Sequence, residues 1–205
     1  MDLTPRRLEG PSVRLEPLGA RHLDGLCEVG LDPELWRLTV SRVHDRAGME
    51  RYLAAALAEQ QAGTALPFAT VWRATGQVIG STRFGNASAE HRRVEIGWTW
   101  LGPRWQRTGV NTEAKYLMLR HAFEQWDCIR VELKTSVLNE RSRAAMRRIG
   151  AREEGIFRRH MLNEDGSIRD SVFYSVIAEE WPEVKRHLER LMADPGARVP
   201  APEDG

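Results

Sequence analysis

The chain has little that would suit it to an oxidising compartment or to a membrane. It contains two cysteines, Cys27 and Cys128, whose spacing matches neither a CxxC pair nor a metal site, so we expect buried structural thiols. No apolar run approaches the length that spans a bilayer, and the N-terminal residues lack the apolar core of a signal peptide. We therefore expect a cytoplasmic protein that does not enter a membrane.

The chain also lacks an excess of charge of either sign. Thirty basic residues stand against twenty-nine acidic ones, a formal net charge of +1, so no long-range field would attract nucleic acid or lipid. The six histidines show no ligand spacing, so no metal site is expected, and we expect His121 to be a hydrogen-bonded core residue. Any anion that the protein binds must therefore be held by local geometry.

The most informative stretch that is present runs from residue 93 to residue 123. It predicts a strand over 93–101, a polar loop over 102–109 and a helix over 111–123. The alternation of the strand places four apolar residues on one face, away from Glu95: Val94, Ile96, Trp98 and Trp100. The unpaired N–H groups and the positive dipole end at the start of the helix suit a phosphate. The stretch therefore predicts an anion-binding unit with a carboxylate beside it.

The remaining elements fit around this unit as one α/β domain, because 205 residues are within the range of a single core. Strands are expected over 11–17, 66–74, 77–84, 129–136, 152–161 and 168–177, and helices over 21–29, 49–60, 139–150 and 181–192. The strand at 129–136 follows a crossover helix and is expected to run parallel to the one at 93–101. We expect the domain to cover 11–182, with a C-terminal helix at 183–193 and a flexible tail at 194–205.

This ordered set of segments resembles the GNAT superfamily of N-acetyltransferases, and within it the branch that acetylates the N-termini of ribosomal proteins. The resemblance is carried by Gln106-Arg-Thr-Gly-Val-Asn111, Thr112-Glu-Ala-Lys-Tyr, Leu119-Arg-His-Ala-Phe-Glu124, Asn139-Glu-Arg-Ser142, and Gly166-Ser-Ile-Arg-Asp-Ser-Val-Phe-Tyr-Ser175 followed by Glu179-Glu-Trp-Pro182. It implies a single α/β (α+β) domain with a mixed, mostly antiparallel twisted sheet of about seven strands. This sheet would be splayed at a cofactor groove and covered by helices on both faces.

The resemblance also implies acetyl-CoA as co-substrate, with its pyrophosphate on the backbone amides of the loop. The residues implied to bind it are Trp100, Leu101, Gln106, Arg107, Thr108, Gly109, Val110, Asn111, Thr112, Asn139 and Ser142. Asn111 stands where a small residue is usual, so its side chain could crowd the phosphates or cap the helix, and we expect the cap. Glu113 is expected on a solvated stripe with Arg120 and Glu124, where its charge would compete with a phosphate. Arg104 and Arg107 could offset that charge.

Two residues are implied to act in catalysis. Glu95 matches the family position of a general base, although it could instead be paired with Arg93 or another strand residue. Ser142 is the candidate to protonate the leaving thiolate, because the tyrosine usual in the family falls at Met146. Tyr174 is a second candidate for that proton, or a strand-packing residue. Asn139 could simply cap its helix, and a backbone N–H between Trp98 and Leu101 could steady the oxyanion.

The acceptor is expected to be an amine that loses its proton easily. An α-amine has a pKa of about 8 and a lysine about 10.4, which favours a protein N-terminus or a weakly basic small molecule. The acceptor pocket is expected around Trp36, Tyr52 and the hairpin residues Arg158, Arg159 and His160, although these loop and rim positions could equally be surface residues that serve solubility. Two alternatives remain, a small-molecule acetyltransferase and an impaired acyl-CoA-binding module. A nucleotide-binding protein is disfavoured because no Walker or dinucleotide glycine pattern occurs. A homodimer through the C-terminal hairpin or helix is a further expectation of the resemblance.

Overall fold

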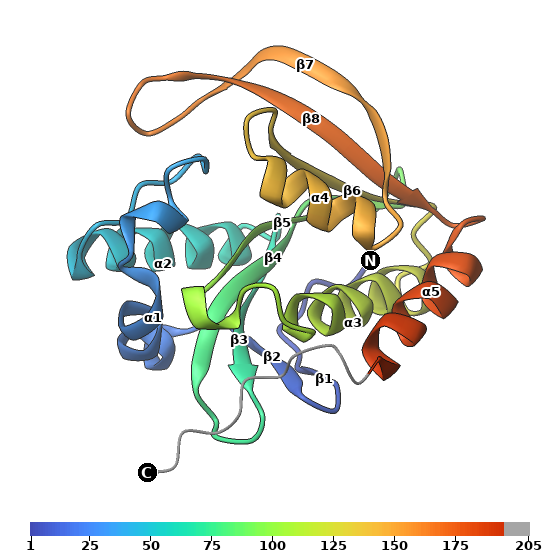
Figure 1. The fold of residues 1–205 in the computed structure, drawn as a ribbon, viewed down its shortest axis with the longest axis horizontal. Helices are drawn as coiled ribbons and strands as arrows, with labels where there is room; N and C mark the ends of the chain where they lie inside the picture. The colour runs from blue at the N-terminus through green and yellow to red at the C-terminus, as the bar shows by residue number, and fades with distance from the viewer. Residues whose placement is uncertain (195–205) are drawn as a thin grey trace.

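The computed structural model describes residues 1–194 as one α/β domain built on a mixed sheet (Figure 1). The sheet has eight strands in the order β1-β2-β3-β4-β5-β6-β8-β7, and every neighbouring pair is antiparallel except β5 and β6. The strands are β1 (Leu8–Glu9), β2 (Val13–Pro17), β3 (Leu66–Trp72), β4 (Val78–Ser88), β5 (Arg93–Leu101), β6 (Arg130–Ser136), β7 (Arg152–Leu162) and β8 (Ile168–Ile177). The fold class is confirmed. The additional strand is β1, which is too short for alternation to reveal.

Helices cover both faces of the sheet, as expected. α1 and α2 lie against one face, and α3 and α5 lie against the other (Figure 1). The helices are α1 (Leu23–Gly30), α2 (Arg46–Gln61), α3 (Val110–Glu124), α4 (Glu140–Arg148) and α5 (Trp181–Ala193), with short 3-10 turns η1 (Ala20–His22), η2 (Pro33–Leu35) and η3 (Pro103–Trp105). Within residues 1–194, no helix has both the length and the apolar character needed to cross a membrane.

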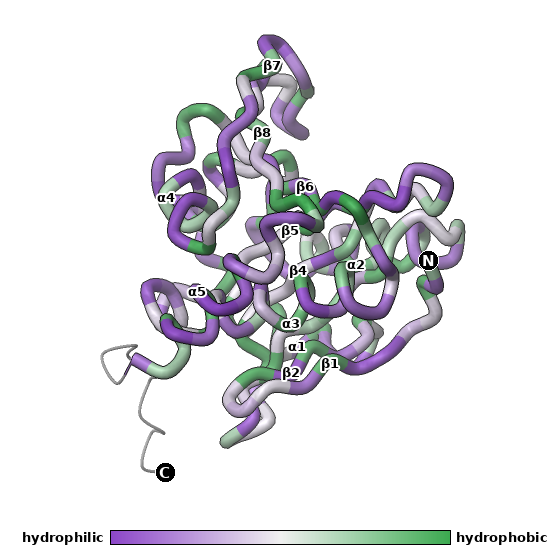
Figure 2. The backbone as a smooth tube through the Cα atoms, turned by 90° about the vertical axis from the view of Figure 1, so that its right-hand side faces the viewer, coloured by the Kyte–Doolittle hydropathy of each residue, from purple (hydrophilic) through white to green (hydrophobic). Residues whose placement is uncertain are grey.

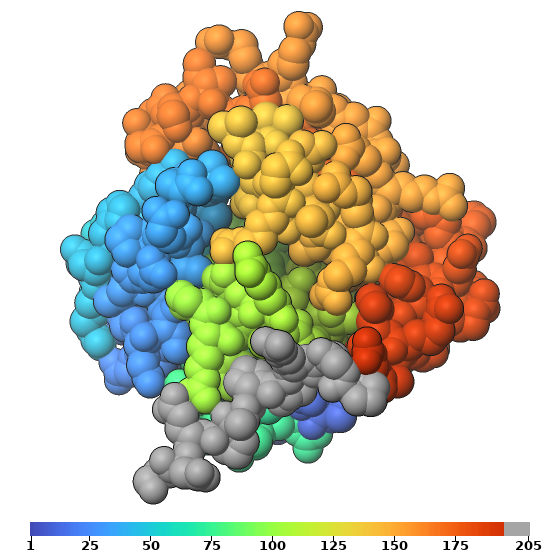
Figure 3. Space-filling view, in the orientation of Figure 1, coloured from blue at the N-terminus to red at the C-terminus, as the bar shows by residue number. Residues whose placement is uncertain are grey.

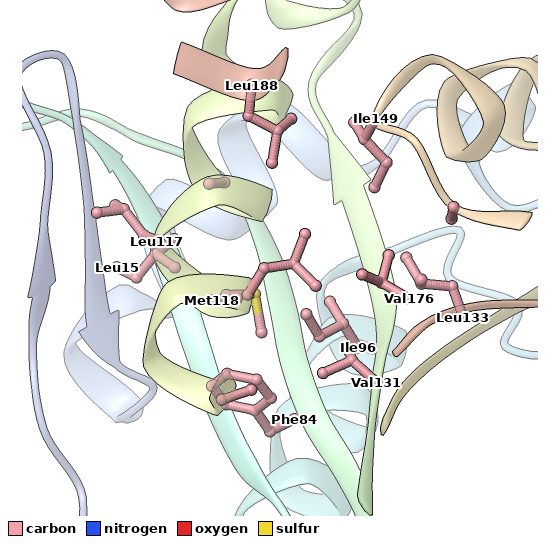
Figure 4. Close-up of a cluster of buried hydrophobic side chains, with 14 of the residues drawn as sticks. Leu15, Phe84, Ile96, Leu117, Met118, Val131, Leu133, Ile149, Val176 and Leu188 are labelled. Atoms are coloured by element: carbon pink, nitrogen blue, oxygen red, sulfur yellow. The ribbon is translucent and has the colours of Figure 1, made fainter. Parts of the chain in front are cut away.

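The main core surrounds α3, which is buried on most sides because the sheet lies on one side of it and α5 on the other. Leu117 and Met118 share this core with Phe84 and Ile96 of the sheet and with Leu188 of α5 (Figure 4). Complete burial of one such side chain contributes about 1.5–3 kcal/mol. The start of α3 is therefore held in a fixed position relative to β5.

One buried polar side chain of this core, His121, differs from its predicted hydrogen bonding. His121 is buried against the rings of Phe84 and Trp126, and its Nε2 has no hydrogen-bond partner within residues 1–194. Burial lowers the pKa of His121 to about 4. The prediction of a hydrogen-bonded core histidine is therefore wrong for this nitrogen. Cys128 is buried and Cys27 partly so, and burial raises the pKa of both thiols.

β5 changes face part-way along its length. Trp98 has a φ of +49°, and the pairing of β5 with β4 shifts register at this point. Ile96, before the bulge, packs in the α3 core, whereas Trp100, after it, packs in the core formed with α1 and α2. An extra residue reverses the sides that later side chains face. The prediction that one face holds all four apolar residues of this strand is therefore wrong beyond Ile96.

The sheet is splayed between β5 and β6. Their parallel pairing, which the sequence predicted, extends only from Arg93 to Glu95 on β5. Beyond that point β6 continues to Ser136 against β8, while β5 continues to Leu101 against β4. The two strands diverge, and the backbone of residues 96–101 is left without a strand partner on the β6 side.

The start of α3 also differs from expectation. The helix begins at Val110, its N-cap is Gly109, and no side chain caps it. Asn111 is the second helical residue, so the prediction that Asn111 caps the helix is wrong. The loop residues before it take over that role in part, since the Thr108 hydroxyl accepts a hydrogen bond from the N–H of Val110 at 3.3 Å.

The C-terminal hairpin of β7 and β8 projects from the body of the molecule, with hydrophilic residues prominent at its tip, residues 163–167 (Figure 2). It carries exposed apolar side chains, including Phe157, and a homodimer through this region stays a prediction. The domain limits of 11–182 also stay a prediction. The predicted tail lies outside the described residues from 195 onward.

Candidate active site

A cavity of about 670 Å³ lies between the diverging strands β5 and β6. Figure 3 shows the surface hollowed between α4 (yellow), the segment leading into α3 (green) and the N-terminal helices (blue). Of the residues predicted to bind acetyl-CoA, together with Glu95 and Ser142, the cavity brings together all but one: Glu95, Trp100, Leu101, Gln106, Arg107, Thr108, Gly109, Asn111, Thr112, Asn139 and Ser142. The exception is Val110, which is buried in the main core.

One end of the cavity, which we call the α3 end, is formed by residues 106–112 and α4. The first intrahelical bond runs from the N–H of Glu113 to the carbonyl of Gly109, at 3.0 Å. The N–H groups of Asn111 and Thr112 therefore precede the hydrogen-bond ladder of the helix, at the positive end of its dipole. Arg107, exposed on the loop with a φ of +60°, lines the cavity beside them. This end is built to receive an anion.

Two arginines of α4, which the sequence analysis missed, add positive charge at the α3 end. Arg141 donates to Oε1 of Gln106 at 2.6 Å, and Arg148 donates to the hydroxyl of Thr112 at 2.6 Å. Both line the cavity. Their separation of seven residues, two helical turns, is the signal that could have found them, because it places them on one helix face. Arg104, by contrast, does not line the cavity.

Glu113 does not lie on a solvated stripe, as had been predicted. It is buried, and its Oε1 accepts hydrogen bonds from the N–H groups of Ser12 and Val13 at 2.8 and 2.9 Å. These bonds tie the start of β2 to the first turn of α3. A Cβ added at Gly10 would lie 2.2 Å from the same oxygen, so the close approach requires glycine there. Glu113 is a structural residue.

Glu95 lies inside the cavity and is only 3% exposed. Its Oε2 accepts hydrogen bonds from Nζ of Lys134 and Nδ2 of Asn86, both at 2.6 Å. Arg93 pairs with Glu132 instead. The alternative of an ion pair with another strand residue therefore holds, and the partner comes from β6. Both of these bonds engage Oε2, and a Cβ added at Gly97 would lie 2.8 Å from Oε1.

α4 presents two of the predicted residues to the cavity. Oδ1 of Asn139 accepts from the N–H of Ser142 at 3.0 Å, so Asn139 caps the helix while lining the cavity. Ser142 is half-buried and Met146 lies one turn further along the same lining. Tyr174 lies outside the lining, because its hydroxyl donates to Glu153 at 2.7 Å on the opposite side of β8 from Arg169. Its buried phenol is a packing residue.

The other end, which we call the Trp36 end, is lined with aromatic rings. Trp36, Tyr52 and Trp100 form mutual ring contacts with centroids 5.3 to 6.4 Å apart. Trp36 and Tyr52 are where the sequence predicted them. From the hairpin, however, the lining residues are Met161 and Arg169, so the prediction of Arg158, Arg159 and His160 is wrong. The cause is a register shift in β7 between Phe157 and Met161, where Arg159 has a φ of +52°.

The hairpin tip contacts the loop before α2, which contributes lining residues to the Trp36 end. Arg42 forms an ion pair with Asp165 at 2.8 Å, and its N–H donates to Oε2 of Glu164 at 2.6 Å. The N–H of Glu164 donates in turn to the carbonyl of Val40 at 3.0 Å. This contact joins segments more than one hundred and twenty residues apart in the sequence.

A buried lysine between the two ends was missed by the sequence analysis. Lys115 of α3 is 5% exposed, lines the cavity, and donates to the hydroxyls of Thr99 and Thr82 at 2.6 and 3.4 Å. Desolvation lowers the pKa of Lys115 to about 7. The signal was its position between the core residues Ala114 and Met118, where a lysine stem must be buried.

Comparison with known proteins agrees with this geometry. Residues 12–152 match the family model of the acetyltransferase (GNAT) domain. The chain belongs to the GNAT family of acetyltransferases. Members of this family use acyl-CoA.

Individual GNAT relatives cover different parts of the chain. A protein of Bacillus subtilis (strain 168) named "Putative ribosomal N-acetyltransferase YdaF" is 35% identical over 106 residues, which are 52% of this chain and 57% of that protein. The chain therefore spans little more than half the length of this curated relative. A GCN5-related N-acetyltransferase structure from Brucella melitensis is 31% identical, with a TM-score of 0.86 over 95% of this chain and 90% of that one.

A more distant GNAT structure, Mycobacterium smegmatis RimJ in complex with CoA-disulfide, shares the fold. Its TM-score is 0.76 over 92% of this chain and 95% of that chain, at 24% identity. At this identity the likeness concerns the fold, and the cavity of the present chain has two features of its own. Free amides and arginines lie at the α3 end for phosphates, and an unpaired strand edge lies between β5 and β6 for an extended arm.

Proposed function

We propose that this protein transfers an acetyl group from acetyl-CoA to a primary amine, with a protein N-terminal α-amine as the leading acceptor. The observation that carries the proposal is a single cavity that joins an anion-binding helix N-terminus to a buried carboxylate, Glu95. Acetyl-CoA, when bound, supplies the acetyl group as a thioester. The residues of the chain bind the two substrates, orient them and manage two protons.

The α3 end holds the pyrophosphate in this proposal. The N–H groups of Asn111 and Thr112 and the guanidinium groups of Arg107, Arg141 and Arg148 are the donors that favour it. The Asn111 side chain is part of the lining rather than a cap, so it is available to a ligand. The unpaired edge of β5 holds the pantetheine arm as an added strand.

Glu95 accepts the proton of the incoming amine, directly or through one water. Both of its recorded hydrogen bonds engage Oε2, and Oε1 remains for this task. The partners Lys134 and Asn86 hold the carboxylate in one orientation, which favours catalysis because a misplaced base transfers protons poorly. An α-amine, with a pKa of about 8, needs little help at neutral pH.

The remaining two roles fall to β5 and α4. The bulge at Trp98 turns the backbone of β5 toward the splayed side, where an N–H steadies the oxyanion of the transition state. The hydroxyl of Ser142 protonates the leaving thiolate, which is the role that Met146 cannot fill. Asn139 positions Ser142 by capping the helix.

The acceptor class is proposed on two grounds. The name of the Bacillus subtilis relative refers to ribosomal N-acetylation, which supports a protein N-terminus. The ring contacts of Trp36, Tyr52 and Trp100 at the Trp36 end support the second candidate, a small-molecule amine, because pockets for small ligands are lined by aromatic side chains. Both acceptors present one primary amine to Glu95.

The test measures thiol release from acetyl-CoA with N-terminal peptides of ribosomal proteins and a panel of amine metabolites, with mass spectrometry of the products. We expect one acceptor class to release thiol with wild type, and Glu95→Gln to release it at least about 10²-fold more slowly. If CoA raises the melting temperature while no amine yields thiol, the chain is an acyl-CoA-binding module. If CoA has no effect either, the proposal is wrong.

A further inference from the structure

The Trp36 end contains a buried cation that lacks a counter-ion. Arg169 of β8 is 8% exposed and lines the cavity. Its Nε is buried without a hydrogen-bond acceptor, and no carboxylate within residues 1–194 forms an ion pair with it. Arginine is rarely buried unless it is paired, and an unmet buried donor is costly. Such a group in a substrate cavity indicates that a ligand supplies the missing acceptor.

The carboxylates near Arg169 are already engaged. Glu95 is held by Lys134 and Asn86, and Asp165 is held by Arg42. The two cations that line this end, Lys134 and Arg169, therefore face one anion, Glu95, which leaves one positive charge uncompensated. Burial lowers the pKa of Arg169 and the charge of Glu95 opposes that shift, so the two groups act on each other across the cavity. The guanidinium nevertheless stays charged.

Other features of this end exclude the phosphates of acetyl-CoA as the missing partner. The free amides and three arginines belong to the α3 end, whereas Met161 and Arg169 come from the hairpin, whose tip contacts the loop before α2. The cavity lining also includes the rings of Trp36, Tyr52 and Trp98, which suit the body of a small acceptor group rather than a diphosphate.

We propose that the acceptor carries a carboxylate close to its amine, and that Arg169 binds this carboxylate while the amine lies at Glu95. The planar fork of a guanidinium matches two carboxylate oxygens, which fixes orientation as well as adding affinity. This inference rests on the proposed transfer to an amine. The carboxylate has two possible sources, the α-carboxylate of a free amino acid and the side chain of an acidic N-terminal residue.

The experiment uses two matched pairs of acceptors with the full chain and acetyl-CoA. The first pair is alanine and alaninamide, and the second is a C-terminally amidated peptide beginning with Asp and the same peptide beginning with Asn. We expect wild type to prefer the carboxylate-bearing member of one pair roughly 10- to 100-fold in kcat/KM. The pair that shows the preference identifies the source of the carboxylate.

Two variants then assign the preference to Arg169. Arg169→Met should abolish it by lowering kcat/KM for the carboxylate acceptor, through KM, while the neutral acceptor changes little. Arg169→Lys should retain part of it, since charge remains but the fork is lost. Arg158→Met, at an exposed arginine of the same hairpin outside the cavity, is the matched control and should behave as wild type.

Several outcomes would overturn the inference. Wild type with no preference in either pair is one, and an Arg169→Met variant that loses both members of a pair equally, with an unchanged CoA-induced melting shift, is another. If no acceptor releases thiol, the transferase proposal fails. The carboxylate site at Arg169 is then tested by ligand binding, measured as thermal stabilisation. Alanine or the Asp peptide should then stabilise the CoA-bound wild type but not Arg169→Met, and stabilisation of neither protein would contradict it.

Discussion

The two ends of the cavity hold charge in opposite ways. At the α3 end the cations are exposed arginines, two on α4 and one on the loop before α3. The two on α4, Arg141 and Arg148, donate hydrogen bonds to Gln106 and Thr112. At the Trp36 end the charges are largely buried. Glu95 forms an ion pair with Lys134, whereas the Nε of Arg169 has no hydrogen-bond partner within residues 1–194. Exposed charges are screened by water and salt, whereas buried ones are not. In our proposal the co-substrate therefore binds to exposed, screened charges, and the acceptor is selected by buried, unscreened ones.

The largest expected effect at the Trp36 end comes from Glu95→Gln. We expect kcat to fall about 10²- to 10⁴-fold, because the amide cannot accept the proton of the amine. The measurement is thiol release at saturating acetyl-CoA and acceptor. Glu132→Gln is the matched control, since Glu132 lies opposite Glu95 on β6 but outside the cavity, and it should retain activity. Equal losses in the two variants would contradict the assignment.

A smaller loss at the same end is expected from Gly97→Ala. The new Cβ would lie 2.8 Å from Oε1 of Glu95, so the carboxylate has to move. A displacement near one ångström of a catalytic group costs roughly 10² in rate. The CoA-induced shift in melting temperature should stay that of wild type, because the α3 end is untouched. Unchanged kcat in a folded Gly97→Ala protein would show that the position of Oε1 is unimportant.

The contrast between the ends also explains what could be predicted from the sequence. The loop and helix N-terminus of the α3 end come from one continuous segment and could be predicted locally, whereas its two α4 arginines, Arg141 and Arg148, come from another segment and were missed. The Trp36 end is assembled from segments that lie far apart in the sequence: the loop at Trp36, α2, β5, β6 and the C-terminal hairpin. Its composition depended on the bulge at Trp98 and the register shift before Met161, neither of which alternation reveals. Arg169 was therefore missed, and the hairpin residues named in its place were wrong.

The same reasoning applies to side chains whose role depends on a distant partner. Glu113 looked solvated on a helical wheel, because nothing local shows that the backbone of Ser12 and Val13 reaches it. The fold class, by contrast, followed from the order of local patterns, since parallel pairing after a crossover helix and antiparallel hairpins are determined by connectivity.

Lys115 lies between the two ends, and replacing it should change the pH dependence of the free energy of unfolding. Its pKa is about 7 in the folded protein and 10.5 is its ordinary value, so between these pH values the unfolded chain binds more protons. The stability of wild type should therefore rise with pH in this window relative to Lys115→Met, by about 1.4 kcal/mol per pH unit. Urea unfolding at pH 7, 8 and 9 measures the difference.

A control separates this effect from the general pH dependence of the protein. Lys185 is paired with Glu124 near the surface, and that partner raises its pKa, so it stays protonated in both states between pH 7 and 9. Lys185→Met should differ from wild type by an amount that does not change with pH. In Lys115→Met the hydroxyls of Thr82 and Thr99 still bond each other at 2.7 Å, so no donor is orphaned. A constant difference for Lys115→Met would show that this lysine is not desolvated.

The smallest expected effect tests the α3 end. Arg148→Met should raise KM for acetyl-CoA about three- to tenfold, since one exposed charge-assisted contact to a phosphate is lost in a screened setting. The effect should shrink as salt is raised, because the interaction of exposed charges weakens over the shorter Debye length. KM for the acceptor should not change. Arg147→Met is the control, at the adjacent arginine of α4, which does not line the cavity. If Arg148→Met instead alters acceptor KM, or if its effect is independent of salt, the two ends are not electrostatically distinct.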